Sequence, residues 1–191
     1  MKKILLPIAL LIAVIGIAAF TNKQTKQVSP KPLVFEEEVK WLSWEEAMEA
    51  NKKQPRKIVV DVYTSWCGWC KVMDKQTFPN DTVANYLNKH YYCVKLDAEG
   101  RDTIRFSNQT FVYITPEKGG GRNGIHTLAY SLLDGQMSFP TLVYLTEKME
   151  RVAISPGYKT PEKLMPELRF TAEEAFRTKT FENFMKESAG K

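Results

Sequence analysis

The amino-acid sequence predicts an α/β fold with a central mixed β-sheet flanked by helices. An apolar, β-branched run at 58–63 is followed by helix-forming residues and then by a second buried run at 91–96. Such an order requires a crossover connection, so these two strands are expected to be parallel. Later in the chain, the runs 141–145 and 151–154 are joined by a turn at 147–150, which predicts an antiparallel pair. Apolar residues make up 43% of the 191 residues, enough for one buried core.

The first 20 residues have the pattern of a signal peptide or a signal anchor. Two lysines follow Met1, and an uncharged apolar run covers residues 4–20. This run is slightly long for the core of a signal peptide and at the lower limit for a membrane span. Gly16 and Ala18 form a small-x-small site that favours cleavage after Ala18, and an uncleaved N-terminal membrane anchor is the alternative. Both interpretations export the protein, and the bacterial character of the leader indicates the periplasm or cell envelope.

A polar linker is expected at residues 21–35, which carry Lys, Gln, Ser and two prolines. The folded domain should then span residues 36–191. Its first helix is predicted from the capping box Ser43-Trp44-Glu45-Glu46 and should end near Lys52, before the break at Gln54-Pro55.

The remaining elements follow from periodicity and from start and stop signals. Short strands at 103–106 and 111–114 are expected to form a hairpin around 107–110. Further helices are expected over 70–76 and 125–133, and another from a cap at Asp81 to His90. Two more should begin at Pro161, with a kink at Pro166, and after a cap at Thr180.

The chemistry of the chain is concentrated in the stretch Trp66-Cys67-Gly68-Trp69-Cys70-Lys71, directly after the first buried strand. One turn of helix would bring both sulfur atoms together at its N-terminal end. Unpaired N–H groups and the helix dipole favour a thiolate there, so Cys67 is the expected nucleophile and Cys70 the resolving thiol.

A Cys-x-x-Cys pair can be a redox dithiol, half of a zinc site or a structural disulfide. A zinc site needs two more ligands, but only Cys93, His90 and His126 remain and none has partner spacing. Structural disulfides more often join distant segments. The redox dithiol is therefore the favoured interpretation, with no metal and no cofactor besides the Cys67–Cys70 pair.

These residues and their order resemble the thioredoxin-like family. The Trp-Cys-x-x-Cys-Lys motif resembles that family's active site, Asp61 lies where thioredoxins carry a buried Asp, and Phe139-Pro140-Thr141 matches the cis-proline segment. The resemblance covers about residues 36–169. It is nearest in character to exported proteins related to the soluble end of thiol:disulfide interchange proteins.

The resemblance implies a role for each matching residue. Cys67 would attack a substrate disulfide and Cys70 would resolve the mixed disulfide. Asp61 would take the Cys70 proton, because a buried carboxyl has a raised pKa. Pro140, if cis, would lie against the sulfurs and leave the Phe139 backbone free to pair with substrate.

The surface that contacts substrate is expected to be completed by Trp66, Gly68 and Trp69 around the cysteines. The Gly-Trp dipeptide between the cysteines departs from the family's usual pairs, so it leaves the direction of electron flow open. Phe139 is bulkier than the usual residue and should reshape the groove. An insertion at about 98–124 is expected near the active-site face, where it could select a partner.

Four other signals have more ordinary explanations. The Gly-x-Gly-x-x-Gly match at 119–124 is interpreted as a loop and not as a dinucleotide site. Cys93 is expected to be a buried inert thiol, His90 to complement the dipole at a helix end, and His126 to be solvated. Lys95, in the neighbouring strand, could pair with Asp61.

The sequence therefore predicts an exported thiol–disulfide oxidoreductase, more reductase- or isomerase-like than oxidase-like. Its partners would be protein thiols and disulfides and an electron donor. The net charge of +5 falls to +3 without the two leader lysines, and no basic stripe with aromatics appears, so nucleic-acid binding is not expected. The alternative is a non-catalytic module of the same fold that binds partners or carries copper or zinc transiently on the same cysteines.

Overall fold

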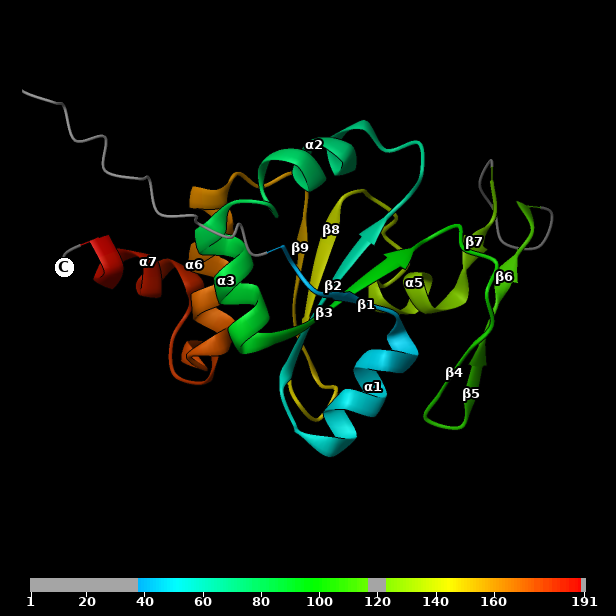
Figure 1. Cartoon of the computed structure of the whole chain (residues 1–191), viewed down its shortest axis with the longest axis horizontal. Coiled ribbons are helices and arrows are strands. Elements are labelled where there is room, and N and C mark those ends of the chain that lie inside the picture. Colours follow the sequence, from blue (N-terminus) through cyan, green and yellow to red (C-terminus); the bar gives the residue numbers. More distant parts are fainter. Residues whose placement is uncertain (1–37, 117–122, 190–191) are drawn as a thin grey trace, which may run out of the picture. The chain divides into compact units, whose positions relative to one another are not determined.

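The core of the fold is a five-stranded mixed sheet with the strand order β1-β3-β2-β8-β9. It is seen in a computed structural model of the chain that describes residues 38–116 and 123–189 (Figure 1). The strands are β1 (Trp41–Leu42), β2 (Lys57–Tyr63), β3 (Tyr91–Asp97), β8 (Thr141–Leu145) and β9 (Arg151–Pro156). β2 runs parallel to β3 and antiparallel to β8, and β8 runs antiparallel to β9. The predicted mixed sheet, crossover and antiparallel pair are confirmed.

Helices pack on both faces of this sheet. They are α1 (Trp44–Lys53), α2 (Gly68–Gln76), α3 (Asp81–His90), α5 (Thr127–Leu132), α6 (Pro161–Ala172) and α7 (Phe181–Ala189), with the short 3-10 helix η1 (Ala175–Arg177) before α7. Side chains of α1 and α5 pack with Val60 and Val62 of β2. Those of α2, α3 and α6 pack with Val59 on the other face. β2 is therefore buried between two apolar layers, which explains its nearly unbroken apolar sequence.

Local capping signals set the start of most helices. The Ser43 side chain accepts a hydrogen bond from the Glu46 N–H, and the Glu46 carboxylate accepts one from the Ser43 N–H. This is the predicted capping box of α1. Thr180 likewise accepts a hydrogen bond from the Asn183 N–H at the start of α7. Each contact satisfies an N–H group that the helix itself leaves unpaired.

The predicted cap of one helix is wrong. Asn80, and not Asp81, caps α3, because its side-chain oxygen accepts hydrogen bonds from the N–H groups of Thr82 and Val83. α6 begins at Pro161 as expected and continues through Pro166 to Ala172, and the kink at Pro166 stays a prediction.

The segment between β3 and β8 contains two short hairpins as well as α5. β4 (Ile104–Phe106) pairs with β5 (Gln109–Phe111), and Ser107 and Asn108 turn the chain with positive φ. The predicted hairpin is therefore present but shorter. Its predicted continuation to residue 114 is wrong, because β6 (Tyr113–Ile114) pairs instead with β7 (Ile125–His126). Residues 117–122, most of the glycine-rich stretch, lie outside the described residues.

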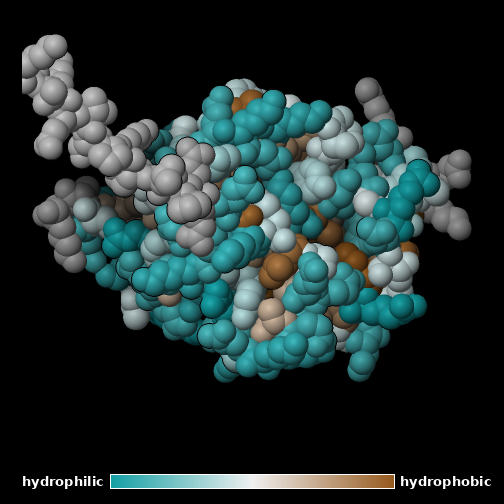
Figure 2. All heavy atoms as spheres, viewed as in Figure 1, coloured by the Kyte–Doolittle hydropathy of each residue, from teal (hydrophilic) through white to brown (hydrophobic). Residues whose placement is uncertain are grey.

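This segment packs against α1. The face drawn in Figure 2 is mostly hydrophilic, and its hydrophobic atoms show mainly between α1 and the β4–β7 part of the chain. A hollow of about 190 Å³ is lined there by Trp44, Ile104 and His126, among other residues. Ile104, Leu128 and Leu133 of this segment belong to the same buried apolar cluster as Trp44 and Val60, so the segment is part of the main core.

His126 is buried, so the prediction that it is solvated is wrong. Only 1% of its surface is exposed. The Leu128 N–H donates to Nδ1 at 3.3 Å, and Nε2 lies 3.0 Å from the carbonyl oxygen of Asp102. A nitrogen that accepts a hydrogen bond carries no proton, so Nε2 carries it and donates to Asp102. The ring therefore caps α5 and holds the loop before β4.

We expect His126→Ala to lower the free energy of unfolding by roughly 2–3 kcal/mol, because it leaves two backbone groups unpaired and opens a cavity. Urea unfolding followed by circular dichroism measures this change. The matched control is His90→Ala at the partly exposed end of α3, where a loss below about 1 kcal/mol is expected. Equal losses for the two variants would contradict the role assigned to His126.

The predicted signal segment 1–20 and linker 21–35 lie outside the described residues. The described residues belong to one compact unit. Among residues 38–116 and 123–189, none of the helices combines the length and apolarity needed to cross a membrane.

Candidate redox site

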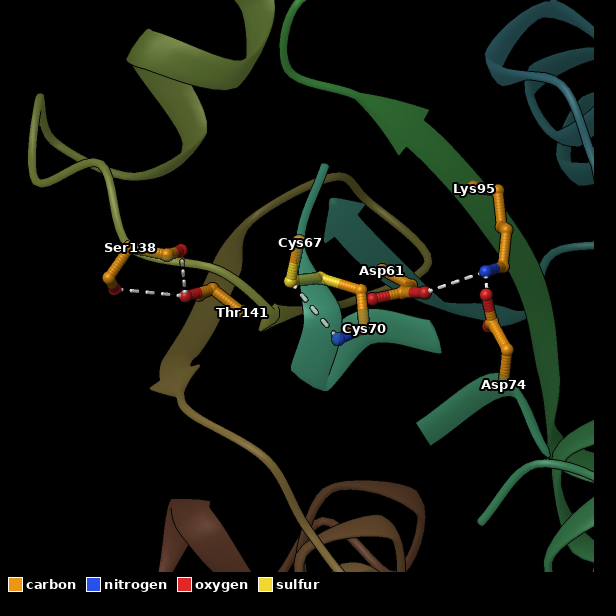
Figure 3. The surroundings of a disulfide bond; sticks show 7 residues. All are labelled: Asp61, Cys67, Cys70, Asp74, Lys95, Ser138 and Thr141. Carbon is orange, nitrogen blue, oxygen red and sulfur yellow. Dashed lines mark hydrogen bonds and ion pairs between the residues drawn. A yellow bond between two sulfur atoms is a disulfide. The ribbon is translucent and has the colours of Figure 1, made fainter. Parts of the chain in front are cut away.

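Cys67 and Cys70 are joined by a disulfide at the N-terminal end of α2 (Figure 3). Cys67 is the N-cap residue, and the N–H of Cys70 donates to its sulfur at 3.0 Å. In the reduced protein the same N–H and the helix dipole would stabilise a negative charge on Cys67. The structure therefore brings the two predicted cysteines together in the predicted place.

The disulfide is recessed. Cys67 and Cys70 expose only 4% and 3% of their surfaces, whereas the tryptophans before them, Trp66 and Trp69, expose 58% and 62%. Gly68, between Cys67 and Trp69, is the first residue of α2 and has open space where a side chain would be. A partner therefore meets the tryptophans before it meets sulfur.

Each of these tryptophans is paired with an aromatic ring from a distant segment. The Trp66 and Phe139 rings are edge to face with centroids 6.0 Å apart, and the Trp69 and Tyr158 centroids are 5.3 Å apart. We call these four residues the aromatic rim. Tyr158 was not anticipated from the sequence, because it follows β9 and comes next to Trp69 only in the folded chain.

The cis-proline segment is present. The Phe139–Pro140 peptide bond is cis. The Thr141 hydroxyl donates to the carbonyl oxygen of Ser138 at 2.7 Å, and the Gly157 N–H donates to that of Pro140 at 2.8 Å. In Figure 3 the Ser138–Thr141 turn and Asp61 are seen on opposite sides of the disulfide. The residues that the resemblance places around the sulfurs thus come from two separate parts of the chain.

Asp61 lies in the middle of β2 with only 2% of its side chain exposed. Its Oδ2 is 3.2 Å from the Lys95 ammonium, and its buried Oδ1 has no hydrogen-bond partner. Burial raises the pKa of Asp61 from 3.8 to about 6, against the lowering effect of Lys95. Figure 3 shows the carboxyl between Lys95 and the disulfide. Its geometry suits a group that accepts a proton near neutral pH.

Lys95 pairs with Asp61, as their neighbouring strands led us to expect, and it also pairs with Asp74 of α2. The Tyr63 and Trp41 rings lie 4.9 and 5.1 Å from its nitrogen. Asp74 was not anticipated, although a signal was present. It follows Cys70 by four residues, which places both on one side of α2.

The insertion reaches the motif through Glu99. The Trp66 indole N–H donates to the Glu99 carboxylate at 2.9 Å, and the Asn123 amide donates to the same oxygen at 3.2 Å. Glu99 and Asn123 both belong to the predicted insertion at 98–124. One part of that segment is therefore attached to the aromatic rim.

Cys93 is buried in β3 as a free thiol. Burial raises its pKa to about 12, so it holds its proton at neutral pH and is a poor nucleophile. Over the ranges 38–116 and 123–189, no group of three or more His, Cys, Asp or Glu side chains is arranged to hold a metal ion.

Most of the chain matches the model of one protein family. The model of the family described as "Thioredox_DsbH: Protein of unknown function, DUF255" matches residues 21–173. The chain is 35% identical over 83 residues to spermatogenesis-associated protein 20 of Mus musculus, which is 43% of this chain and 10% of that protein. It is 30% identical over 105 residues to uncharacterized protein B0495.5 of Caenorhabditis elegans, which is 54% of this chain and 14% of that one. These relatives are thus much longer than the region they share with this chain.

Solved structures with a similar fold include a DsbH oxidoreductase, with a TM-score of 0.53 and 15% identity over 78% of this chain and 94% of the other. A thioredoxin-fold protein from Helicobacter pylori also has a TM-score of 0.53, with 14% identity over 77% and 83% of the two chains. At these identities the similarity shows the fold alone.

Proposed function

This chain belongs to the thioredoxin-like DsbH family, and from that premise we propose that it is a thiol–disulfide oxidoreductase acting on protein disulfides. The family description names no established function. The observation that carries the proposal is the Cys67–Cys70 disulfide at a helix N-terminus with the buried Asp61 carboxyl beside it (Figure 3).

The reductive reaction has two sulfur-transfer steps. The Cys67 thiolate attacks one sulfur of a substrate disulfide, forms a mixed disulfide and releases the other substrate sulfur as a thiolate. The Cys70 thiol then gives its proton to Asp61 and attacks the Cys67 sulfur. This step forms the Cys67–Cys70 disulfide and releases the second substrate sulfur. The substrate gains two electrons, and an external dithiol must reduce the protein again.

The shape of the site supports an extended protein segment as substrate. Because the sulfurs are recessed while the neighbouring Trp66 and Trp69 are exposed, a substrate disulfide would contact the aromatic rim as it approaches the sulfurs. Apolar side chains on either side of the substrate cysteine would bury the exposed faces of Trp66 and Trp69. A reductase or isomerase in the cell envelope, where disulfides form and persist, is the setting that best fits the predicted leader.

The test is turnover of a fluorescence-quenched disulfide peptide with dithiothreitol as electron donor. The wild-type chain is expected to cleave many equivalents of peptide, and Cys93→Ser is the matched control that keeps the rate. Cleavage limited to one equivalent per protein would contradict the proposal. The reduction potential of the Cys67–Cys70 pair, measured in glutathione buffers, tests the reductive direction.

The alternative of a transient copper or zinc carrier is not proposed. For zinc, two sulfurs would need further ligands, and the part of the chain that the structure describes contains no group of three or more His, Cys, Asp or Glu arranged to hold a metal. A copper carrier would show stoichiometric metal binding and no redox cycling, which the turnover experiment distinguishes.

A further inference from the structure

The Lys95 ammonium is shared unequally by two carboxylates from different elements. Asp61 of β2 lies 3.2 Å away, and Asp74 of α2 is closer. Asp61 is almost fully buried, whereas Asp74 exposes 39% of its side chain. The buried Asp61 carboxylate has the larger desolvation cost of the two, yet it lies farther from the Lys95 ammonium and is stabilised less by it.

The contacts around Lys95 hold it where both carboxylates can reach it. Its ammonium faces the rings of Tyr63 and Trp41, and such contacts favour a cation on a ring face. Only 22% of its side chain is exposed. With Lys95 confined in this way, Asp74 decides how much of its charge remains available to Asp61.

Asp74 also lies on a part of the surface that does not include the disulfide. Asp74, Lys95, Trp41 and Phe78 are among the residues that line a hollow of about 380 Å³, and neither cysteine nor Asp61 lines it. The hollow beside Asp74 is therefore separate from the surface at the sulfurs.

We propose that Asp74 is a positioning residue of the redox site. By binding Lys95, it prevents this lysine from fully neutralising Asp61, and so it leaves the buried carboxyl able to take the Cys70 proton near neutral pH. The catalytic importance of this arrangement rests on the function proposed above, but the electrostatic arrangement itself can be tested without turnover.

Among the described residues, the charged groups that act on the Asp61 carboxyl are Lys95 from β3 and Asp74 from α2. Two further titratable groups lie near it, the Tyr63 hydroxyl of β2 and, in the reduced protein, the Cys70 sulfur of α2. From β8, the residue paired with Asp61 is the apolar Leu142. Asp74 raises the pKa of Asp61 as a like charge, and it also competes for Lys95. Both effects disappear together in Asp74→Asn, and both changes lower the pKa of Asp61.

The direct experiment is an NMR titration of the Asp61 carboxyl carbon in the oxidised protein. In Asp74→Asn the midpoint is expected to fall by roughly one pH unit. Asp74→Glu keeps the charge and should keep the midpoint close to that of the wild type. Asp134→Asn, which removes an acid paired with Arg151 instead, is the matched control and should leave the midpoint unchanged. An unchanged or higher midpoint in Asp74→Asn would overturn the proposal.

The kinetic readout is the pH dependence of kcat/KM for the quenched peptide. Asp74→Asn is expected to move the acid limb to lower pH and to reduce the rate at neutral pH, because a weaker base takes the Cys70 proton less readily. Asp74→Glu should restore the wild-type profile. If the wild type shows no turnover but Asp74→Asn still lowers the Asp61 midpoint, the proposed function fails and the role of Asp74 in setting Asp61 stands.

Discussion

Cys67→Ser is expected to lose at least about 10³-fold in disulfide turnover, because a hydroxyl cannot replace a thiolate as the attacking group. The substitution should leave the fold intact. Cys67 is the N-cap of α2 and its sulfur accepts the Cys70 N–H, and serine is a favoured residue for that position. The loss would therefore report on chemistry and not on the helix. Rates with the quenched peptide, together with circular dichroism of the variant, measure both properties.

The Cys70→Ser variant distinguishes the role of Cys67 from that of Cys70. Cys67 can still attack substrate, but no second sulfur resolves the product, so a mixed disulfide between Cys67 and the peptide should accumulate and be visible by mass spectrometry. Wild-type activity in Cys67→Ser would show that the assigned roles are wrong. So would a mixed disulfide that accumulates on Cys70 in Cys67→Ser but not on Cys67 in Cys70→Ser.

Asp61→Asn is expected to slow turnover by roughly 10²-fold, since it removes the group that takes the Cys70 proton. The same change should stabilise the protein at pH 8. Burial raises the pKa of Asp61 from 3.8 to about 6. The folded state therefore binds the proton more tightly than the unfolded state, and ionising this group disfavours folding.

The pH dependence of this stabilisation follows from the two pKa values. Below about pH 4 Asp61 is protonated in both states and the effect is absent. As the pH rises towards 6 the wild type loses stability, and above that it carries a constant deficit of up to about 3 kcal/mol. Asparagine has no charge to bury, and Lys95 retains its contact with Asp74.

Urea unfolding of the wild type and Asp61→Asn at pH 4 and pH 8 measures this difference. The variant should be more stable at pH 8, and the gap should narrow at pH 4. If the variant is less stable than the wild type at pH 8, the ion pair of Asp61 with Lys95 stabilises the fold by more than the burial of the Asp61 charge costs. Slower turnover combined with higher stability would mark Asp61 as a residue that serves the reaction at the expense of the fold.

The local pattern of the sequence was a good guide to the elements that carry the site. The nearly unbroken apolar run of β2 placed Asp61 in a buried strand, and the capping box and the Cys-x-x-Cys spacing placed two helix starts. Where the prediction failed, a competing local contact was responsible. Asn80, and not Asp81, occupies the cap position of α3. His126 was expected to be a solvated residue of the helix 125–133, but it belongs to β7 and caps α5, which begins at Thr127.

Residues that modify the site were harder to predict because they act across long distances in the chain. Glu99 meets Trp66 from 33 positions away, and Tyr158 meets Trp69 only after β8 and β9 have formed their hairpin. Periodicity reports which side of an element is apolar. It does not report which loop ends next to which helix.

The sequence by itself determined the parallel pairing of β2 with β3, the antiparallel pairing of β8 with β9, the two cysteines of the dithiol and the burial of Asp61, because each depends on spacing and on runs of apolar residues. Only the tertiary structure decided that Lys95 is divided between Asp61 and Asp74, and that Trp66 is attached to Glu99. These contacts join side chains from separate elements. How readily a buried carboxyl ionises depends on the charges that lie near it in the folded protein, and these cannot be read from its neighbours in the sequence.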